Sequence, residues 1–94
     1  MKKIELQFNL PVTILKENKR FVAYSPALDL STSGKSHKEA QKRFVKIARI
    51  FFEEIIKKGT IDDVLSDLGW HKTKQAWQPP ILVSQELEKI SLCA

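Results

Sequence analysis

The fold of this chain depends on one stretch of sequence, Val22-Ala23-Tyr24-Ser25-Pro26-Ala27-Leu28-Asp29-Leu30-Ser31-Thr32-Ser33-Gly34-Lys35-Ser36. Two short runs, Phe21–Tyr24 and Leu28–Thr32, have the composition and alternation of strands. Pro26 separates them, because proline lacks a backbone donor and disfavours helix in the residue before it. Gly34 is expected to supply a flexible corner after the second run. The sequence before this stretch is predicted to be strand, and most of the sequence after it helix.

Upstream, apolar and polar residues alternate strictly from Ile4 to Ile14, which predicts a strand with one buried face. Pro11 cannot donate to a ladder, so this strand either lies at a sheet edge there or contains a bulge. The polar break Glu17–Arg20 predicts a hairpin to the next strand. The three strands together predict an antiparallel sheet, and with the helices that follow they predict an α+β fold.

Downstream, Ser36 and Glu39 have the spacing of a capping box. Ser36 would accept from the Glu39 amide, and the Glu39 side chain would return to the Ser36 amide. The pattern predicts a long helix from about His37 to Lys58, ended by Gly59. It would pack on one face of the sheet.

A second, short helix is predicted to start with a Thr60 cap and to end at Gly69, with Trp70 folding back on its last turn. Residues 71–78 are predicted to form a loop. Short strands are predicted at Ile81–Val83 and Ile90–Leu92.

Apolar residues cover about half of the long helix, whereas packing on one sheet needs a stripe of only about 100°. The extra width comes from Val45, Phe52 and Ile56. These three residues are the candidate oligomer or partner interface, and their partner would be the C-terminal segment or another subunit.

The opposite face of the helix is basic and is a candidate surface for nucleic acid or an acidic partner. The alternative is a solvated face, partly neutralised by the i,i+4 pairs Arg49–Glu53 and Glu53–Lys57. The basic candidates are Lys35, Lys38, Lys42, Arg43, Lys46 and Arg49.

Composition indicates one domain over residues 1–94, with a core of about 3–69 and a C-terminal extension of 70–94. The net charge is +5, and the single cysteine, Cys93, excludes an intramolecular disulfide. The N-terminus lacks the continuous apolar run of a signal peptide, and no run is long enough for a membrane span. We therefore expect a cytoplasmic protein without membrane contact.

Residues that could perform chemistry are few and dispersed. His37 and His71 stand 34 positions apart and lie outside any ligand or nucleophile motif. They would be the acid–base residues only if the protein were a cryptic hydrolase. Asp62 and Asp63 are adjacent residues in the first turn of the short helix. We expect them to stabilise its N-terminus through the helix dipole, and metal binding is the less favoured alternative. We expect a non-enzymatic protein with no catalytic residues, no cofactor and no metal.

The stretch and the helix after it resemble the HicB-like antitoxin family. The resemblance rests on Phe21–Leu28, on Ser31–Ala40, which includes Gly34-Lys35-Ser36 and Glu39-Ala40, and on Phe51-Phe52-Glu53-Glu54 at the helix end. It extends over about Pro11 to Lys58, more than half of the domain.

The resemblance implies a β-β-β-α order with a further strand, similar to part of a ribonuclease-H-like domain. It also implies self-association as a homodimer or tetramer, and binding that occludes a small basic HicA-like ribonuclease toxin. Two features depart from the family. The residues after Lys58 show no DNA-binding unit, and the +5 charge is unexpected for a partner of a basic toxin. A basic nucleic-acid-binding protein and an orphan oligomeric domain without a toxin are the alternative functions.

Overall fold

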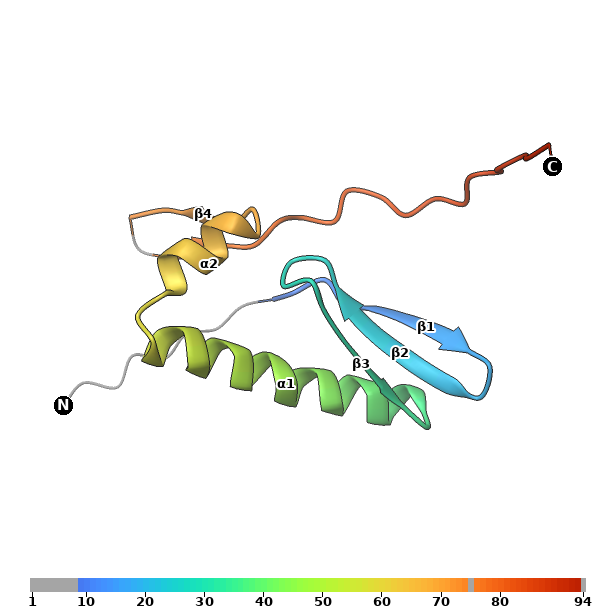
Figure 1. The fold of residues 1–94 in the computed structure, drawn as a ribbon, viewed down its shortest axis with the longest axis horizontal. Coiled ribbons are helices and arrows are strands. Elements are labelled where there is room, and N and C mark those ends of the chain that lie inside the picture. The colour runs from blue at the N-terminus through green and yellow to red at the C-terminus, as the bar shows by residue number, and fades with distance from the viewer. Residues whose placement is uncertain (1–8, 75, 94) are drawn as a thin grey trace.

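The structure is a computed structural model that describes residues 9–74 and 76–93. Strands β1, β2 and β3 form one antiparallel sheet in that order, and helix α1 lies along one of its faces (Figure 1). A short helix α2 and a two-stranded ribbon, β4–β5, follow α1. The chain therefore has the predicted α+β fold. The elements are β1 (Thr13–Glu17), β2 (Arg20–Ser25), β3 (Leu30–Gly34), α1 (His37–Lys57), α2 (Ile61–Asp67), β4 (His71–Lys72) and β5 (Trp77–Gln78).

The first strand begins later than its sequence pattern predicts. Residues 9–12 have no regular structure, and β1 pairs with β2 only from Thr13 opposite Tyr24 to Glu17 opposite Arg20. The predicted strand residues 4–8 lie outside the described residues. Because β2 ends at Ser25, before Pro26, the residues that precede Thr13 have no partner strand to pair with.

The third strand is displaced by two residues from the predicted Leu28–Thr32. Residues 26–29 form the turn between β2 and β3, and Asp29 adopts a left-handed conformation with φ of 49°. Gly34 is consequently the last residue of β3 and not a flexible corner. Its absent side chain matters for packing: a Cβ there would lie 2.7 Å from the Ala40 backbone nitrogen.

The long helix has nearly the predicted bounds, and half of the capping box is formed. The Glu39 amide donates to Ser36 Oγ at 3.1 Å. The Glu39 carboxylate instead pairs with Arg43 at 3.0 Å, so the predicted return to the Ser36 amide is wrong. Gly59, with φ of 70°, follows the C-cap residue Lys58, as expected for a left-handed stop.

The short helix also has its predicted extent, but its cap differs. Thr60 makes no side-chain cap, and its hydroxyl contacts the Ile55 carbonyl at 3.4 Å. Gly69 ends the helix with φ of 89°. The Trp70 amide then donates to the Leu65 carbonyl at 2.9 Å, which confirms that Trp70 folds back.

The C-terminal predictions were wrong in two respects. Residues 71–78 form the ribbon β4–β5, in which His71 pairs with Gln78 and Lys72 with Trp77. The segments Ile81–Val83 and Ile90–Leu92 are not strands, because residues 79–93 extend away from the body without a pairing partner (Figure 1).

Small side chains bring α1 close to the sheet. Ala23 of β2 and Ala40 of α1 are fully buried, and Phe44 is nearly so. Leu65 and Trp70 continue this core beyond the end of the sheet. The buried apolar cluster consists of Ala23, Ala27, Leu28, Ala40, Phe44, Ala48, Ile55, Leu65 and Trp70.

Trp70 connects the C-terminal elements to the turn between β2 and β3. Its indole Nε1 donates to the Ala27 carbonyl at 2.8 Å in a buried position. Its ring meets Phe52 edge to face, with centroids 5.9 Å apart. The turn, α1 and the segment after α2 thus meet at one side chain.

Within residues 9–74 and 76–93, neither helix combines the length and the apolar character needed to cross a bilayer.

We expect Gly34→Ala to lower the free energy of unfolding by about 1–3 kcal/mol, because the new methyl group would overlap the backbone of the first turn of α1. Thermal denaturation followed by circular dichroism measures the effect. The control is Ser31→Ala on the same strand, where the side chain is exposed. Equal stability of the two variants would contradict the steric explanation.

Candidate functional site

Helix α1 carries both surfaces that the sequence predicts. Its inner side packs on the sheet through Ala40, Phe44 and Ala48, and Ile55 continues this buried row toward α2. Helix α1 lies mainly over β3 and β2 and less over β1. The remaining circumference of α1 faces away from the sheet.

The predicted apolar interface divides into two parts. Phe52 is half-buried and packs between Phe51 and Trp70, with centroid distances of 5.7 and 5.9 Å. Its partner is therefore the C-terminal segment, one of the two expected possibilities. Val45 and Ile56 remain exposed by 57% and 48%. Ile50, exposed by 54%, is a third apolar side chain on the outer surface of α1 and lies on a different side from these two.

All six predicted basic residues are exposed, but they do not form one uniform surface. Arg43 binds Glu39 at 3.0 Å and also donates to the Ser33 carbonyl at 3.0 Å. Its guanidinium is thereby directed toward β3 and away from the outer side of the helix. Lys35 precedes the helix and stands next to the cap residue Ser36.

The other four basic residues follow one outer stripe of α1, at Lys38, Lys42, Lys46 and Arg49. Their spacing of i, i+4, i+8 and i+11 keeps them on one side over about 16 Å of helix. Among the ion pairs of the described residues, none includes these four, so the predicted pairs Arg49–Glu53 and Glu53–Lys57 are not formed. Helical geometry places Val45 and Ile56 beside this stripe.

The histidines are far from forming a shared site. His37 lies at the start of α1, where its ring meets Phe21 edge to face at 6.5 Å. His71 is exposed on the ribbon β4–β5. In the described part of the chain, no group of three or more His, Cys, Asp or Glu residues is arranged to hold a metal ion.

The second face of the sheet was not predicted as a surface. No helix of residues 9–74 and 76–93 other than α1 contacts the sheet, so this face is open to solvent. Leu15, exposed by 54%, stands opposite Val22 on it, and Thr13 stands opposite Tyr24. The sequence pattern did not predict this surface, because the alternation that predicts the first strand ends at Ile14. Leu15 was therefore not assigned to either face of the sheet.

Tyr24 is held at one end of the open face. Its hydroxyl donates to Asp29 Oδ1 at 3.2 Å. Partial burial, together with this hydrogen bond and the negative charge of Asp29, raises the pKa of Tyr24 above its ordinary value of 10.0. The protonated phenol is the form that the fold favours.

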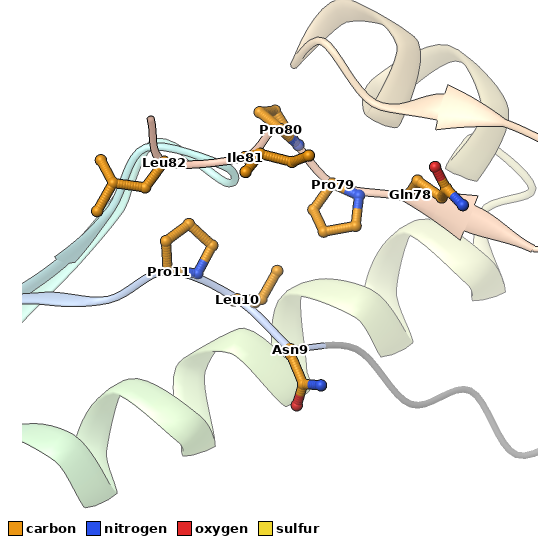
Figure 2. A pocket seen from close by; sticks show the side chains of 8 residues that line it. All are labelled: Asn9, Leu10, Pro11, Gln78, Pro79, Pro80, Ile81 and Leu82. Carbon is orange, nitrogen blue, oxygen red and sulfur yellow. The ribbon is translucent and has the colours of Figure 1, made fainter. Parts of the chain in front are cut away.

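A shallow pocket lies where the segment before β1 meets the segment after β5. Figure 2 shows Leu10 and Pro11 on one side and Pro79, Ile81 and Leu82 on the other, with the rings of Pro11 and Pro79 directed between the two backbones. Its volume is about 450 Å³, and its lining is mostly apolar. The pocket contains no titratable side chain, so it offers packing surface and no acid–base chemistry.

Comparison of the chain with protein-family models, with curated proteins and with solved structures finds no match.

The structure predicts the titration of Tyr24. Asp29→Asn should lower the pKa of Tyr24 toward 10.0, because it removes the negative charge while asparagine still accepts the left-handed backbone at this position. Tyr24 is the only tyrosine, so ultraviolet titration of tyrosinate reports it alone.

A raised pKa in the folded state also means that stability falls as the pH rises above the unfolded-state value of about 10. Asp29→Asn should reduce this alkaline loss. The control Asp67→Asn, on α2, should change neither quantity. A Tyr24 pKa that is unchanged by Asp29→Asn would show that the carboxylate does not contribute.

Proposed function

We propose that this chain is a HicB-like antitoxin module that binds a small HicA-type ribonuclease toxin and covers its active surface. The observation that carries the proposal is the pair of exposed apolar side chains, Val45 and Ile56, on the outer side of α1. The helix already uses its inner side for the core, so these two side chains serve no packing within the described chain. Two exposed apolar side chains on one side of a helix offer contacts to a partner protein.

The order of the elements supports the same proposal. The resemblance implied three antiparallel strands followed by a long helix on one face, and the chain has this arrangement. Gly34, Ser36 and Glu39, which belong to the resembling stretch, make the close junction between β3 and α1.

A basic toxin would meet an unfavourable field at the stripe formed by Lys38, Lys42, Lys46 and Arg49. We therefore place the contact on the apolar side of the stripe, where Val45 and Ile56 would fill a pocket of the toxin. Desolvated apolar contacts can dominate binding even when the surrounding charges are not complementary. Association would be slow at low salt and would become faster as salt screens the repulsion.

Inhibition of purified HicA-type toxins tests this proposal, with cleavage of an RNA substrate as the measurement. The chain should inhibit at a stoichiometric ratio. Val45→Asp combined with Ile56→Asp should weaken inhibition by about tenfold or more, since truncating central contacts costs over about 1 kcal/mol.

The matched control is Ile50→Asp, which changes an equally exposed apolar residue on a different side of α1. It should inhibit like the unmodified chain. The absence of inhibition by the unmodified chain, or equal inhibition by all variants, would refute the proposal.

A second candidate function is nucleic-acid binding, and the unpaired basic stripe favours it. Its four side chains have no carboxylate partner within the described residues and cover a length of helix that can meet several phosphates.

For this function, affinity for a short RNA or DNA duplex should fall steeply with salt concentration. Lys42→Ala with Lys46→Ala should reduce the slope of log K against log salt by about 2, one for each lost phosphate contact. Lys74→Ala, outside the stripe, is the control. Fluorescence anisotropy measures both, and salt-independent or undetectable binding at low ionic strength would eliminate this function.

A further inference from the structure

The segment after β5, which we call the arm (residues 79–93), carries a set of apolar side chains in full contact with solvent. Five of them are exposed by 76% or more: Ile81, Val83, Leu87, Ile90 and Leu92. Exposed apolar area costs about 25 cal/mol per Å² relative to burial. So many apolar side chains on one extended segment indicate a docking element.

The base of the arm is attached to its own chain. Pro79 faces Leu10 and Pro11 across the pocket (Figure 2), and the Gln85 side chain donates to Thr13 Oγ1 at 3.0 Å. Every described residue from Ile81 onward is nevertheless exposed, and the arm runs away from the sheet (Figure 1). The attachment thus sets the direction of the arm, and its outer half meets no surface of its own chain.

The sheet offers edges to which such a segment can add. Its order β1-β2-β3 leaves two outer edges of five residues each. At the β3 edge, Arg43 already donates to the Ser33 carbonyl at 3.0 Å. No side chain of the described residues bonds to the main chain of β1. An open edge of this kind is a template for an added strand.

The charges of the arm and of the β1–β2 hairpin, together with an exposed apolar side chain on β1, also favour the β1 edge over the β3 edge as the acceptor. The outer half of the arm contains two acidic residues, Glu86 and Glu88, and one basic residue, Lys89. The β1–β2 hairpin contains three basic residues and one acidic residue over positions 16–20. The exposed Leu15 of β1 provides an apolar neighbour for one face of an added strand. Unlike charges at the two elements would guide their encounter.

We propose that two copies of this chain associate by exchanging arms, with residues 86–92 of each copy adding as a strand to the outer edge of β1 of the other. Each copy has both the arm and the acceptor, so the exchange is reciprocal and closes at two copies. Pairing across the interface provides the partner strand that the strand-forming segment Ile90–Leu92 lacks in one chain. This dimer uses neither Val45 nor Ile56, so it does not depend on the proposed function.

Disulfide trapping tests the exchange, because Cys93 is the only cysteine and lies at the end of the arm. Unmodified chain is mixed with a second chain that carries Cys93→Ser and a new cysteine at one end of β1, either Lys19→Cys or Val12→Cys. Under oxidised glutathione, one of these two mixtures should give a covalent heterodimer, and which one reports the direction of the added strand. The control partner, Asp67→Cys with Cys93→Ser, places its cysteine on α2 and should give none above background.

A chain that keeps Cys93 and also carries Lys19→Cys or Val12→Cys distinguishes the alternative in which the arm binds its own β1. A disulfide confined to single chains, without heterodimer in the mixtures, would overturn the proposal.

Light scattering after size-exclusion chromatography provides a second measurement. The unmodified chain should have the mass of a dimer, and Leu87→Asp with Ile90→Asp should convert it to a monomer. The helical signal in circular dichroism should be kept, because the arm lies outside the core, and only the strand signal of the exchanged arms should be lost. Val45→Asp with Ile56→Asp should remain dimeric. A monomeric unmodified chain, or a dimer that survives the arm substitutions, would overturn the proposal.

Discussion

The structure depends on the close approach between the end of β3 and the first turn of α1. A Cβ at Gly34 would lie 2.7 Å from the Ala40 nitrogen, so only glycine allows the helix to return over the sheet after two intervening residues. The Ser36 cap starts the helix at that point. Buried alanines at positions 23, 40 and 48 then maintain the short distance between the helix and the sheet. Every exposed surface of α1 follows from this placement.

Trp70 holds the C-terminal half of the chain against the sheet and α1. Its bond to the Ala27 carbonyl fixes the turn between β2 and β3, and its contact with Phe52 fixes the far end of α1. A buried indole that donates its only hydrogen bond holds the elements it touches in a defined arrangement. With Phe52 occupied in this way, Val45 and Ile56 are exposed apolar side chains on one side of the basic stripe of α1, and Ile50 is exposed on the other side.

The fold buries one face of a three-stranded sheet and leaves the other face, one strand edge and the arm in solvent. The open face, the β1 edge and the outer side of α1 are available for contacts with other molecules. The two proposals use separate surfaces for this purpose: the outer side of α1 for a toxin, and the arm with the β1 edge for a second copy. Under these two proposals, a dimer would have room for two toxins, one on each α1.

The sequence alone determined the elements whose signals are local. The Ser36 cap and the left-handed glycines 59 and 69 define both helices, because capping and glycine stops act within one turn. It also determined that the six basic residues are exposed. Tertiary structure decided the features that depend on residues distant in the sequence. It set where β1 begins, because β1 needs β2 beside it, and it directed Arg43 toward β3. It also covered Phe52 with Trp70 and paired residues 71–78 into the ribbon β4–β5. It also left the strand-like segment Ile90–Leu92 without a partner, because a strand forms only where another strand lies beside it.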